Sequence, residues 1–273
     1  MSNVIQLATG QKKNFQIHPG TALKYAEMIS AGIADYFRRI NATVAVIGNS
    51  GGLDSAVTIA ACKKAGLQVL SVMMPYGDNM INSGSYVRAM EMVEKFDCVN
   101  AIVDIKPRCD AMWVDYDREL FDHRIKRVEN ERAVSLQLPN LMAQVRNLVL
   151  RDIARKVKGT LVVDTSNGTE FVLGYYTKDG IGGDLRPFKM CLKREMYMLA
   201  VTYGVVERII LAAPSAELMA GQTDEGEMGF LYREADEFIL HGHCDNHDTE
   251  GRIANMIVST QHKRSEPWFF NGS

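Results

Sequence analysis

Apolar and polar residues follow one another along this chain in blocks that predict strands and helices in turn. Short continuous runs of β-favouring apolar residues are typical of buried parallel strands, whereas apolar residues three or four apart are typical of helices with one packed face. The predicted strands cover residues 44–47, 69–74, 99–105 and 160–163, and the predicted helices cover residues 21–39, 53–64, 85–96 and 141–157. Because strand and helix alternate, we predict an α/β fold with a doubly wound, mainly parallel sheet flanked by helices.

Two stretches stand outside this alternation. Residues 106–139 are charged and show helical but no strand periodicity. We interpret them as a helical excursion, which is either a lid or interface or simply a solvated helix face. Residues 1–20 are polar and mixed and are interpreted as an N-terminal arm. With 273 residues in total, of which 47% are hydrophobic, residues 21–273 are predicted to form a single domain.

Composition narrows the class of protein. The formal net charge is −2, from 31 basic and 33 acidic residues, so we expect neither a nucleic-acid partner nor an anionic membrane surface. Five cysteines at irregular spacing argue against a disulfide framework and for a reducing compartment. Neither a signal-peptide pattern nor an apolar run of about 18 residues, the length that spans a bilayer, occurs in the sequence. We therefore expect a soluble, cytoplasmic protein.

The segment 44–55, VAVIGNSGGLDS, joins the first predicted strand to a helix through a glycine-rich loop. Its two adjacent glycines carry no Cβ, so the backbone can approach an anion closely and reach φ > 0. The free N–H groups at the helix start, together with the hydroxyls of Ser50 and Ser55, are suited to phosphate oxygens. Asp54 would repel phosphate directly, so we expect it to hold a divalent cation that bridges to phosphate.

This loop differs from the two commoner glycine-rich phosphate loops. A Walker loop reads GxxxxGK followed by Ser or Thr, and a dinucleotide fingerprint reads GxGxxG, whereas this loop has GxxGG. Its SGGLDS form resembles the pyrophosphate-binding loop of the N-type ATP pyrophosphatases. Those enzymes cleave ATP to AMP and pyrophosphate while adenylating a substrate.

Further motifs follow in order along the second half of the chain. They are TSNxxE at 165–170, GYYTK at 174–178, GGD at 182–184, LKR at 192–194, PSAE at 214–217, a longer match at 221–239, and QHKR at 261–264. Together with the loop they resemble the ammonia-dependent NAD synthetases over residues 21–264. This resemblance implies an adenine nucleotide alpha hydrolase-like fold and a homodimer.

The resemblance also implies roles for individual residues. Asp54 and Glu170 would bind Mg²⁺, and with Lys193 they would be the catalytic residues. The implied ATP-binding residues are Gly48, Asn49, Ser50, Gly51, Gly52, Leu53, Asp54, Ser55, Thr165, Lys193 and Ser215. The implied residues for deamido-NAD are Gln144, Lys178, Asp184, His262 and Lys263.

The implied reaction is the ATP-dependent amidation of deamido-NAD (nicotinate adenine dinucleotide) with ammonia. The nicotinate carboxylate would attack the α-phosphorus of ATP, giving an acyl-adenylate and pyrophosphate, and ammonia would then give NAD and AMP. Glutamine-dependent relatives carry an additional amidase domain, for which this chain has no room. Free ammonia is therefore the expected nitrogen donor.

Two positions depart from the family pattern. Gln144 stands where the family has an Arg that meets the dinucleotide, and Gln offers no charge and fewer donors. Arg146, or a basic residue within 118–132, is a candidate to replace that charge. The loop TKDGIGGD is one residue shorter than its family counterpart, which bears on Asp184.

Other interpretations stay open at this stage. The chain could be an adenylating ligase of the same superfamily that acts on a different carboxylate, or a catalytically inactive nucleotide-binding sensor. The polar segment 216–229 is a candidate mobile cover for the site. The HGHCDNH stretch, residues 241–247, is interpreted as a surface loop rather than a zinc site, because its spacing lacks a second ligand pair.

Overall fold

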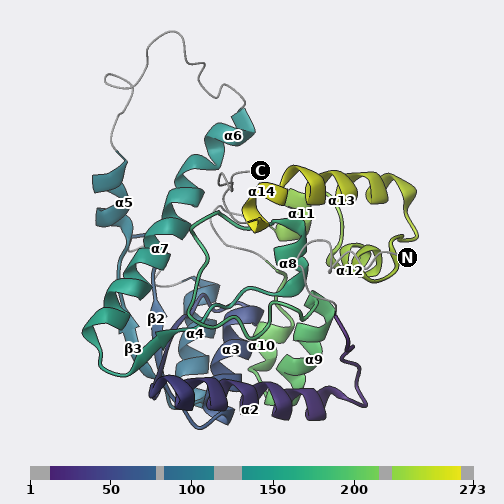
Figure 1. Cartoon of the computed structure of the whole chain (residues 1–273). Coiled ribbons are helices and arrows are strands. Elements are labelled where there is room, and N and C mark those ends of the chain that lie inside the picture. The colour runs from purple at the N-terminus through teal and green to yellow at the C-terminus, as the bar shows by residue number, and fades with distance from the viewer. Residues whose placement is uncertain (1–12, 78–82, 114–130, 215–222, 266–273) are drawn as a thin grey trace, which may run out of the picture.

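The computed structural model describes residues 13–77, 83–113, 131–214 and 223–265. A sheet of four parallel strands lies at its centre, in the order β3-β2-β1-β4 (Figure 1). The strands are β1 (Val44–Gly48), β2 (Gln68–Met73), β3 (Val99–Ile102) and β4 (Thr160–Val162). This order, with β1 in the interior, confirms the predicted parallel α/β sheet.

Helices connect and surround these strands. They are α2 (Ala22–Ile40), α3 (Leu53–Lys64), α4 (Gly84–Lys95), α5 (Lys106–Met112), α6 (Glu131–Ser135), α7 (Gln137–Lys156), α8 (Gly168–Leu173), α9 (Lys193–Tyr203), α10 (Glu207–Ile210), α11 (Asp224–Met228), α12 (Tyr232–His241), α13 (His247–Ser259) and α14 (Gln261–Arg264). None of the described helices is both long and apolar enough to cross a bilayer.

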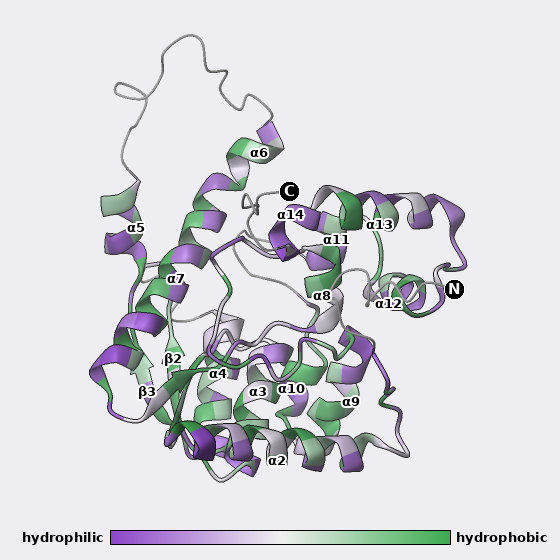
Figure 2. Ribbon diagram, viewed as in Figure 1, coloured by the Kyte–Doolittle hydropathy of each residue, from purple (hydrophilic) through white to green (hydrophobic). Residues whose placement is uncertain are grey.

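Strand β1 is apolar at every position because helices cover both faces of the sheet. Ala45 and Ile47 belong to a cluster that α2, α3 and α9 complete, whereas Val46 belongs to a cluster on the opposite face beneath α7. Alternate residues of a strand point to opposite faces, so a strand buried on both sides needs a continuous apolar run. Helix α2 buries one face only, and in Figure 2 hydrophobic and hydrophilic residues both occur along its length. Because helices cover both faces of the sheet, the prediction of a doubly wound arrangement is confirmed.

The third strand is shorter than predicted, since β3 ends at Ile102 rather than at 105. Asp104 changes the direction of the chain there. Its Oδ1 accepts hydrogen bonds from the backbone N–H groups of Gly77 and Lys106, each at 2.9 Å, and α5 begins at Lys106. Helices α5 and α6 agree with helical structure at both ends of the predicted excursion. Residues 114–130 lie outside the described residues, so its role as lid or interface stays a prediction.

The described part of the N-terminal arm is fixed to helix α9. The Lys13 ammonium donates to Glu195 Oε2 at 2.8 Å and to the carbonyl of Met190 at 2.9 Å. The backbone N–H groups of Ile17 and Leu192 donate to the same carboxylate. The Lys13 and Glu195 side chains are 2% and 0% exposed, so this ion pair joins the arm to the first turn of α9 inside the protein.

Replacing Lys13 with methionine should lower the free energy of unfolding by about 3–5 kcal/mol, because it leaves a buried carboxylate without its cation. Urea denaturation of the wild type and the variant measures the difference. Lys106→Met, which removes an exposed i,i+4 pair with Asp110, serves as the control and should cost no more than about 0.5 kcal/mol. Equal losses from both variants would contradict the assignment of the arm to the core.

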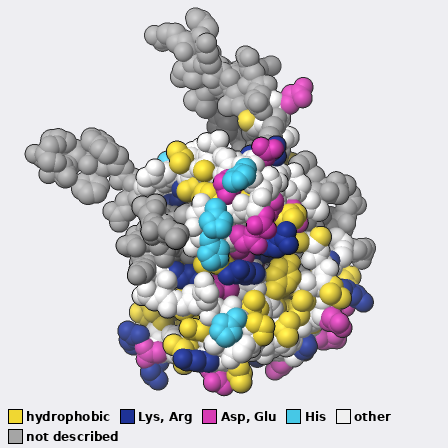
Figure 3. Space-filling view, turned by 90° about the vertical axis from the view of Figure 1, so that its right-hand side faces the viewer, with side chains coloured by type: hydrophobic (Ala, Val, Ile, Leu, Met, Phe, Trp, Pro, Cys, Tyr) yellow, Lys and Arg dark blue, Asp and Glu magenta, His cyan; other side chains and the backbone are white. Residues whose placement is uncertain are grey.

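The HGHCDNH stretch forms the turn between α12 and α13. His241 ends α12, His247 begins α13, and Cys244 is buried with its N–H donating to Glu250 Oε1 at 2.8 Å. Figure 3 views this side of the molecule and shows histidine side chains at the surface beside acidic and basic ones. Within the described ranges, no three His, Cys, Asp or Glu side chains are placed to hold a metal ion together.

Candidate active site

The loop between β1 and α3 is held in shape by side chains from neighbouring elements. The Asn49 amide donates to Ser71 Oγ and to the carbonyl of Ala89, both at 3.1 Å, and its Oδ1 accepts from the N–H of Gly51. Arg88 Nε donates to the carbonyl of Gly51 at 3.0 Å. Strand β2 and helix α4 thus fix the path of the loop before any ligand arrives.

One of the two adjacent glycines needs its lack of a side chain. Gly51 has φ of +71°, and a Cβ there would lie 2.0 Å from the carbonyl oxygen of Ser85 on α4. Gly52 has φ of −94° and caps α3, so it does not use the left-handed region predicted for both glycines. The hydroxyls of Ser50 and Ser55 lie 3.2 Å apart at the start of the helix. The two hydroxyls therefore lie beside the start of α3, where free backbone N–H groups are also suited to phosphate oxygens.

Three charged side chains meet beside this loop, each from the first turn of a different helix. Asp54 lies on α3, Glu170 on α8 and Lys193 on α9. The Lys193 ammonium donates to Asp54 Oδ2 at 2.7 Å and to Glu170 Oε1 at 2.9 Å. Sequence resemblance alone assigned all three to catalysis, and the fold brings them into direct contact.

Burial and the neighbouring charges shift the pKa values of Asp54 and Lys193. Burial raises the pKa of the Asp54 carboxyl to about 6, although the Lys193 ammonium opposes that shift. Burial by itself would lower the pKa of Lys193, but the carboxylates of Asp54 and Glu170 outweigh it and raise that pKa above its usual value. Lys193 therefore carries its positive charge throughout the physiological pH range.

Tyr232 on α12 completes the cluster. Its hydroxyl lies 3.0 Å from Glu170 Oε1 and 3.1 Å from Asp224 Oδ2, and its ring centroid lies 4.7 Å from the Lys193 ammonium. Burial, followed by the charges of Glu170 and Asp224, raises the pKa of the phenol, so it stays protonated. A phenol has one proton, so it can donate to only one of these carboxylates at a time. The sequence motif at 221–239 contains Tyr232, but the motif by itself assigns it no role.

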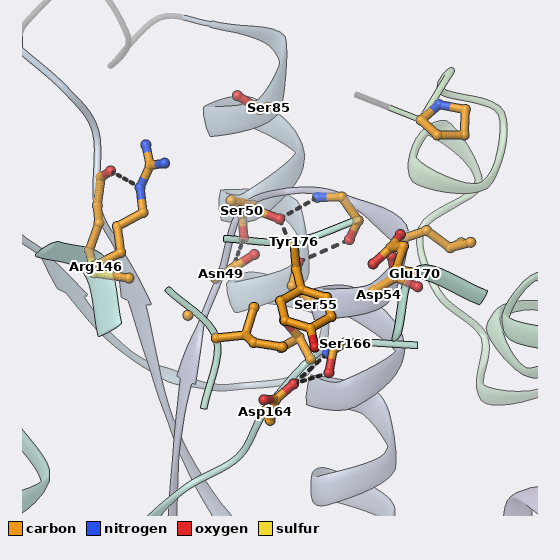
Figure 4. A pocket seen from close by; sticks show the side chains of 18 of the residues that line it. Asn49, Ser50, Asp54, Ser55, Ser85, Arg146, Asp164, Ser166, Glu170 and Tyr176 are labelled. Carbon is orange, nitrogen blue, oxygen red and sulfur yellow. Dashed lines mark hydrogen bonds between the residues drawn. The ribbon is translucent and has the colours of Figure 1, made fainter. Parts of the chain in front are cut away.

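A cavity of about 430 Å³ extends from the loop across the sheet edge (Figure 4). Its lining includes most of the predicted ATP-binding residues: Gly48, Asn49, Ser50, Gly52, Leu53, Asp54, Ser55, Thr165 and Lys193, together with Glu170. Ser215 lies outside the described residues, as does the first half of the predicted mobile cover, residues 216–222. The described end of that cover, 223–229, forms the short helix α11, which Thr223 caps by accepting from the N–H of Gly226.

Arg146 also lines the cavity, on the side away from Asp54 and Glu170 (Figure 4). Its Nε donates to the carbonyl of Met74 at 3.3 Å, and burial lowers the pKa of its guanidinium. Gln144, two positions earlier on α7, instead donates to the carbonyl of Lys178 at 3.3 Å. The cation on α7 that lines the cavity is therefore Arg146, and its role in replacing the missing charge stays a prediction.

The predicted substrate residues do not line this cavity; four of the five belong to the segment 174–184 or contact it. Lys178 and Asp184 belong to that segment, and Gln144 and Lys263 donate to its carbonyl groups. The Asp184 carboxylate pairs with Arg151 at 2.7 Å and accepts from the N–H of Val162 at 2.8 Å. His262 precedes Lys263 on α14, and its side chain is exposed. Substrate contact by these five residues stays a prediction, and Asp184 already has a structural role.

A buried carboxylate behind the cluster fixes two of its helices. Asp236 on α12 accepts hydrogen bonds from the Thr169 hydroxyl and from the N–H of Arg194 at 2.9 Å. Thr169 Oγ1 in turn accepts from the N–H of Lys193 at 2.8 Å. Burial raises the pKa of Asp236 to about 6, opposed by the Thr169 hydrogen bond. Each partner of Asp236 is next in sequence to a catalytic candidate, so this network sets the distance between Glu170 and Lys193.

Thr169→Val should lower the free energy of unfolding by about 1–3 kcal/mol, because it leaves the N–H of Lys193 and a buried carboxylate without this partner. The loss of the Thr169 hydrogen bond should also raise the pKa of Asp236 further. Chemical denaturation measures the first effect and carboxyl NMR titration the second. Thr169→Ser keeps the hydroxyl and should restore most of the stability; a serine variant as unstable as the valine variant would contradict the role of this hydroxyl.

Comparison with known proteins places this site in a family. A sequence profile described as NAD synthase matches residues 25–267. The NH(3)-dependent NAD(+) synthetase of Mycoplasma pneumoniae is 34% identical over 255 residues, which cover 91% of this chain and 95% of that protein. The NMN synthetase of Francisella tularensis superposes with a TM-score of 0.80 at 27% identity, covering 94% of this chain and 100% of that chain.

A second solved structure shares the fold. The NAD+ synthetase of Burkholderia pseudomallei superposes with a TM-score of 0.72 at 23% identity, covering 96% of this chain and 95% of that chain. The four-stranded parallel sheet and its flanking helices are therefore those of the adenine nucleotide alpha hydrolase-like fold. The match of the NAD synthase profile over most of the chain, in agreement with the loop and the charged cluster beside it, shows that this protein belongs to the NAD synthase family.

Proposed function

We propose that this protein catalyses the ATP-dependent amidation of deamido-NAD with ammonia, giving NAD, AMP and pyrophosphate through an acyl-adenylate. One observation supports the proposal most strongly. Lys193 contacts both Asp54 and Glu170 beside the predicted phosphate-binding loop, and all three residues line a cavity large enough for nucleotide groups. The curated relative from Mycoplasma pneumoniae, named for this reaction, aligns over 95% of its length.

The residues of the cluster fit a magnesium ion. Asp54 Oδ2 and Glu170 Oε1 converge on one point, the position of a cation, since both contact the same ammonium. Magnesium is commonly held by one or two carboxylates together with substrate phosphates and water. Asp54 and Glu170 would hold it here, and when bound it would neutralise charge on the triphosphate.

The other groups of the site have separable tasks. The backbone N–H groups of the loop and the hydroxyls of Ser50 and Ser55 would hold the departing pyrophosphate. Lys193 would neutralise the charge that develops as the bond between the α-phosphorus and the bridging oxygen breaks. Arg146 would bind an anionic group at the other side of the cavity. Positioning and charge, rather than a covalent nucleophile, would supply the rate enhancement.

A second candidate substrate is the mononucleotide, nicotinate mononucleotide, in place of the dinucleotide. The likeness to a solved NMN synthetase at a TM-score of 0.80 favours it, as does the neutral Gln144 at the position where the family has an arginine. The chemistry at the carboxylate would be the same. The mononucleotide would lack the AMP half of the dinucleotide and the contacts that the protein makes to it.

Product analysis tests both candidates. The protein is incubated with ATP, Mg²⁺ and ammonium and with either the dinucleotide or the mononucleotide acid, and the amide product and AMP are quantified together. Equimolar amide and AMP with one substrate supports the ligase and identifies that substrate. AMP without amide would indicate adenylation of a different carboxylate, and neither product from a protein that binds ATP would indicate a sensor.

We infer two further properties from the family and the composition. The protein is expected to act in the cytoplasm, since all five cysteines are free thiols. It is also expected to form a homodimer.

A further inference from the structure

The Lys193 ammonium occupies the point where the two expected metal ligands converge. It contacts Asp54 Oδ2 at 2.7 Å and Glu170 Oε1 at 2.9 Å, and its side chain is only 5% exposed. Both oxygens therefore already have a cation as partner. Any divalent ion that takes the same two oxygens must compete with this ammonium.

The competition has an electrostatic basis. Two carboxylate oxygens that contact one nitrogen lie close together, and like charges in a partly buried site repel each other. The ammonium relieves this repulsion in the ligand-free protein. A divalent cation would relieve it more strongly, but it would also repel the ammonium from a position in which it is well satisfied.

The side chain of Lys193 can move without disturbing helix α9. Its backbone N–H is fixed to Thr169 Oγ1 at 2.8 Å, and Asp236 holds that threonine in turn. The four-carbon side chain can therefore rotate about a fixed attachment point. The face of the Tyr232 ring, with its centroid 4.7 Å from the ammonium, lies next to its present position. Phosphate oxygens on the loop would offer stronger acceptors.

We propose that Lys193 serves as the resident cation of the Asp54–Glu170 pair, and that its displacement makes divalent-metal binding depend on a bound triphosphate. This inference rests on the metal role given to Asp54 and Glu170 under the proposed function. Without nucleotide, the metal must displace an ammonium that gains no new partner, so it binds weakly. With nucleotide, the ammonium moves to phosphate oxygens, and the two ligands bind with positive coupling.

Mn²⁺ is a suitable probe, because it prefers the same oxygen ligands as Mg²⁺ and free Mn²⁺ is measured directly by electron paramagnetic resonance. We expect Lys193→Met, without any nucleotide, to bind Mn²⁺ at least ten times more tightly than the wild type. Mn²⁺ should also raise the melting temperature of this variant more than that of the wild type, because the stabilisation by a ligand of the folded state increases with the ratio of its concentration to its Kd.

Lys13→Met is the matched control. It also removes a buried ammonium that lies 2.8 Å from a carboxylate, but at the arm rather than at the Asp54–Glu170 pair. It should bind Mn²⁺ as the wild type does. Unchanged or weaker Mn²⁺ binding by Lys193→Met, or equal tightening in both variants, would overturn the proposal.

Lys193→Gln covers the case in which the methionine variant does not fold. Glutamine removes the charge but keeps N–H donors for the two carboxylates, and the same tightening of Mn²⁺ binding is expected. None of these measurements requires turnover. A failure of the proposed ligase activity would therefore appear in the product assay alone, separately from a failure of this inference.

Discussion

Asp54→Ala should reduce the formation of amide product and AMP by at least about 10²–10³-fold, the usual effect of losing one group that stabilises transition-state charge. Asp54 supplies one of the two carboxylate oxygens that converge at the cluster, and it is also an acceptor for Lys193. Its removal leaves the expected metal with one protein carboxylate and releases the ammonium from one of its two partners. Initial rates at saturating ATP, with both products quantified, measure the effect.

Asp35→Ala is the control for this prediction. Asp35 is an exposed carboxylate on α2 that pairs with Arg38 and Arg39, so its loss should leave the rate unchanged. Circular dichroism establishes that both variants are folded. A folded Asp54→Ala protein that retains more than a tenth of the wild-type rate would exclude Asp54 from the catalytic centre.

Gly51→Ala should damage both the fold and the loop. An alanine at φ of +71° costs about 1–2 kcal/mol, because its Cβ lies too close to the following carbonyl. The same Cβ would lie 2.0 Å from the Ser85 carbonyl oxygen, which belongs to the backbone and cannot rotate away. Relieving that clash requires α4 and the loop to separate, at a further cost of about 1–3 kcal/mol. The N–H groups of the loop then lose their fixed positions, so we expect ATP affinity to fall at least about tenfold.

Gly66→Ala is the control that separates the cost of the positive φ from the cost of the steric clash. Gly66 has φ of +79°, but no atom of the described residues outside its immediate neighbours lies within 4 Å of the place that a Cβ would take. Its substitution should therefore cost only the conformational part and leave ATP affinity unchanged. Urea denaturation and calorimetric titration with a non-hydrolysable ATP analogue compare the two variants. If both lost equal stability and neither lost affinity, the contact between the loop and α4 would not matter for binding.

The local pattern of the sequence determined the elements of this protein and the chemistry of its first loop. The strands at 44–48, 68–73 and 160–162 and the helix at 53–64 follow from continuous or periodic burial, which neighbouring residues alone encode. The glycine pair and hydroxyls after β1 predict a phosphate loop for the same reason. Ordered motifs then gave the family, which the NAD synthase match confirms, whereas the catalytic roles of Asp54, Glu170 and Lys193 stay a prediction.

The packing of the helices decided what the site consists of. Lys193 and Asp54 are 139 positions apart, and their contact depends on α3 and α9 starting at the same edge of the sheet. Tyr232 and Asp236 reach the cluster only because α12 lies against α8 and α9, and Gly51 needs its missing Cβ only because Ser85 lies opposite. Asp184 and Arg146 follow the same rule, since one anchors a loop and the other faces the cavity. The periodicity of apolar residues predicts which residues are buried, whereas contacts between distant segments arise from the tertiary arrangement of strands and helices.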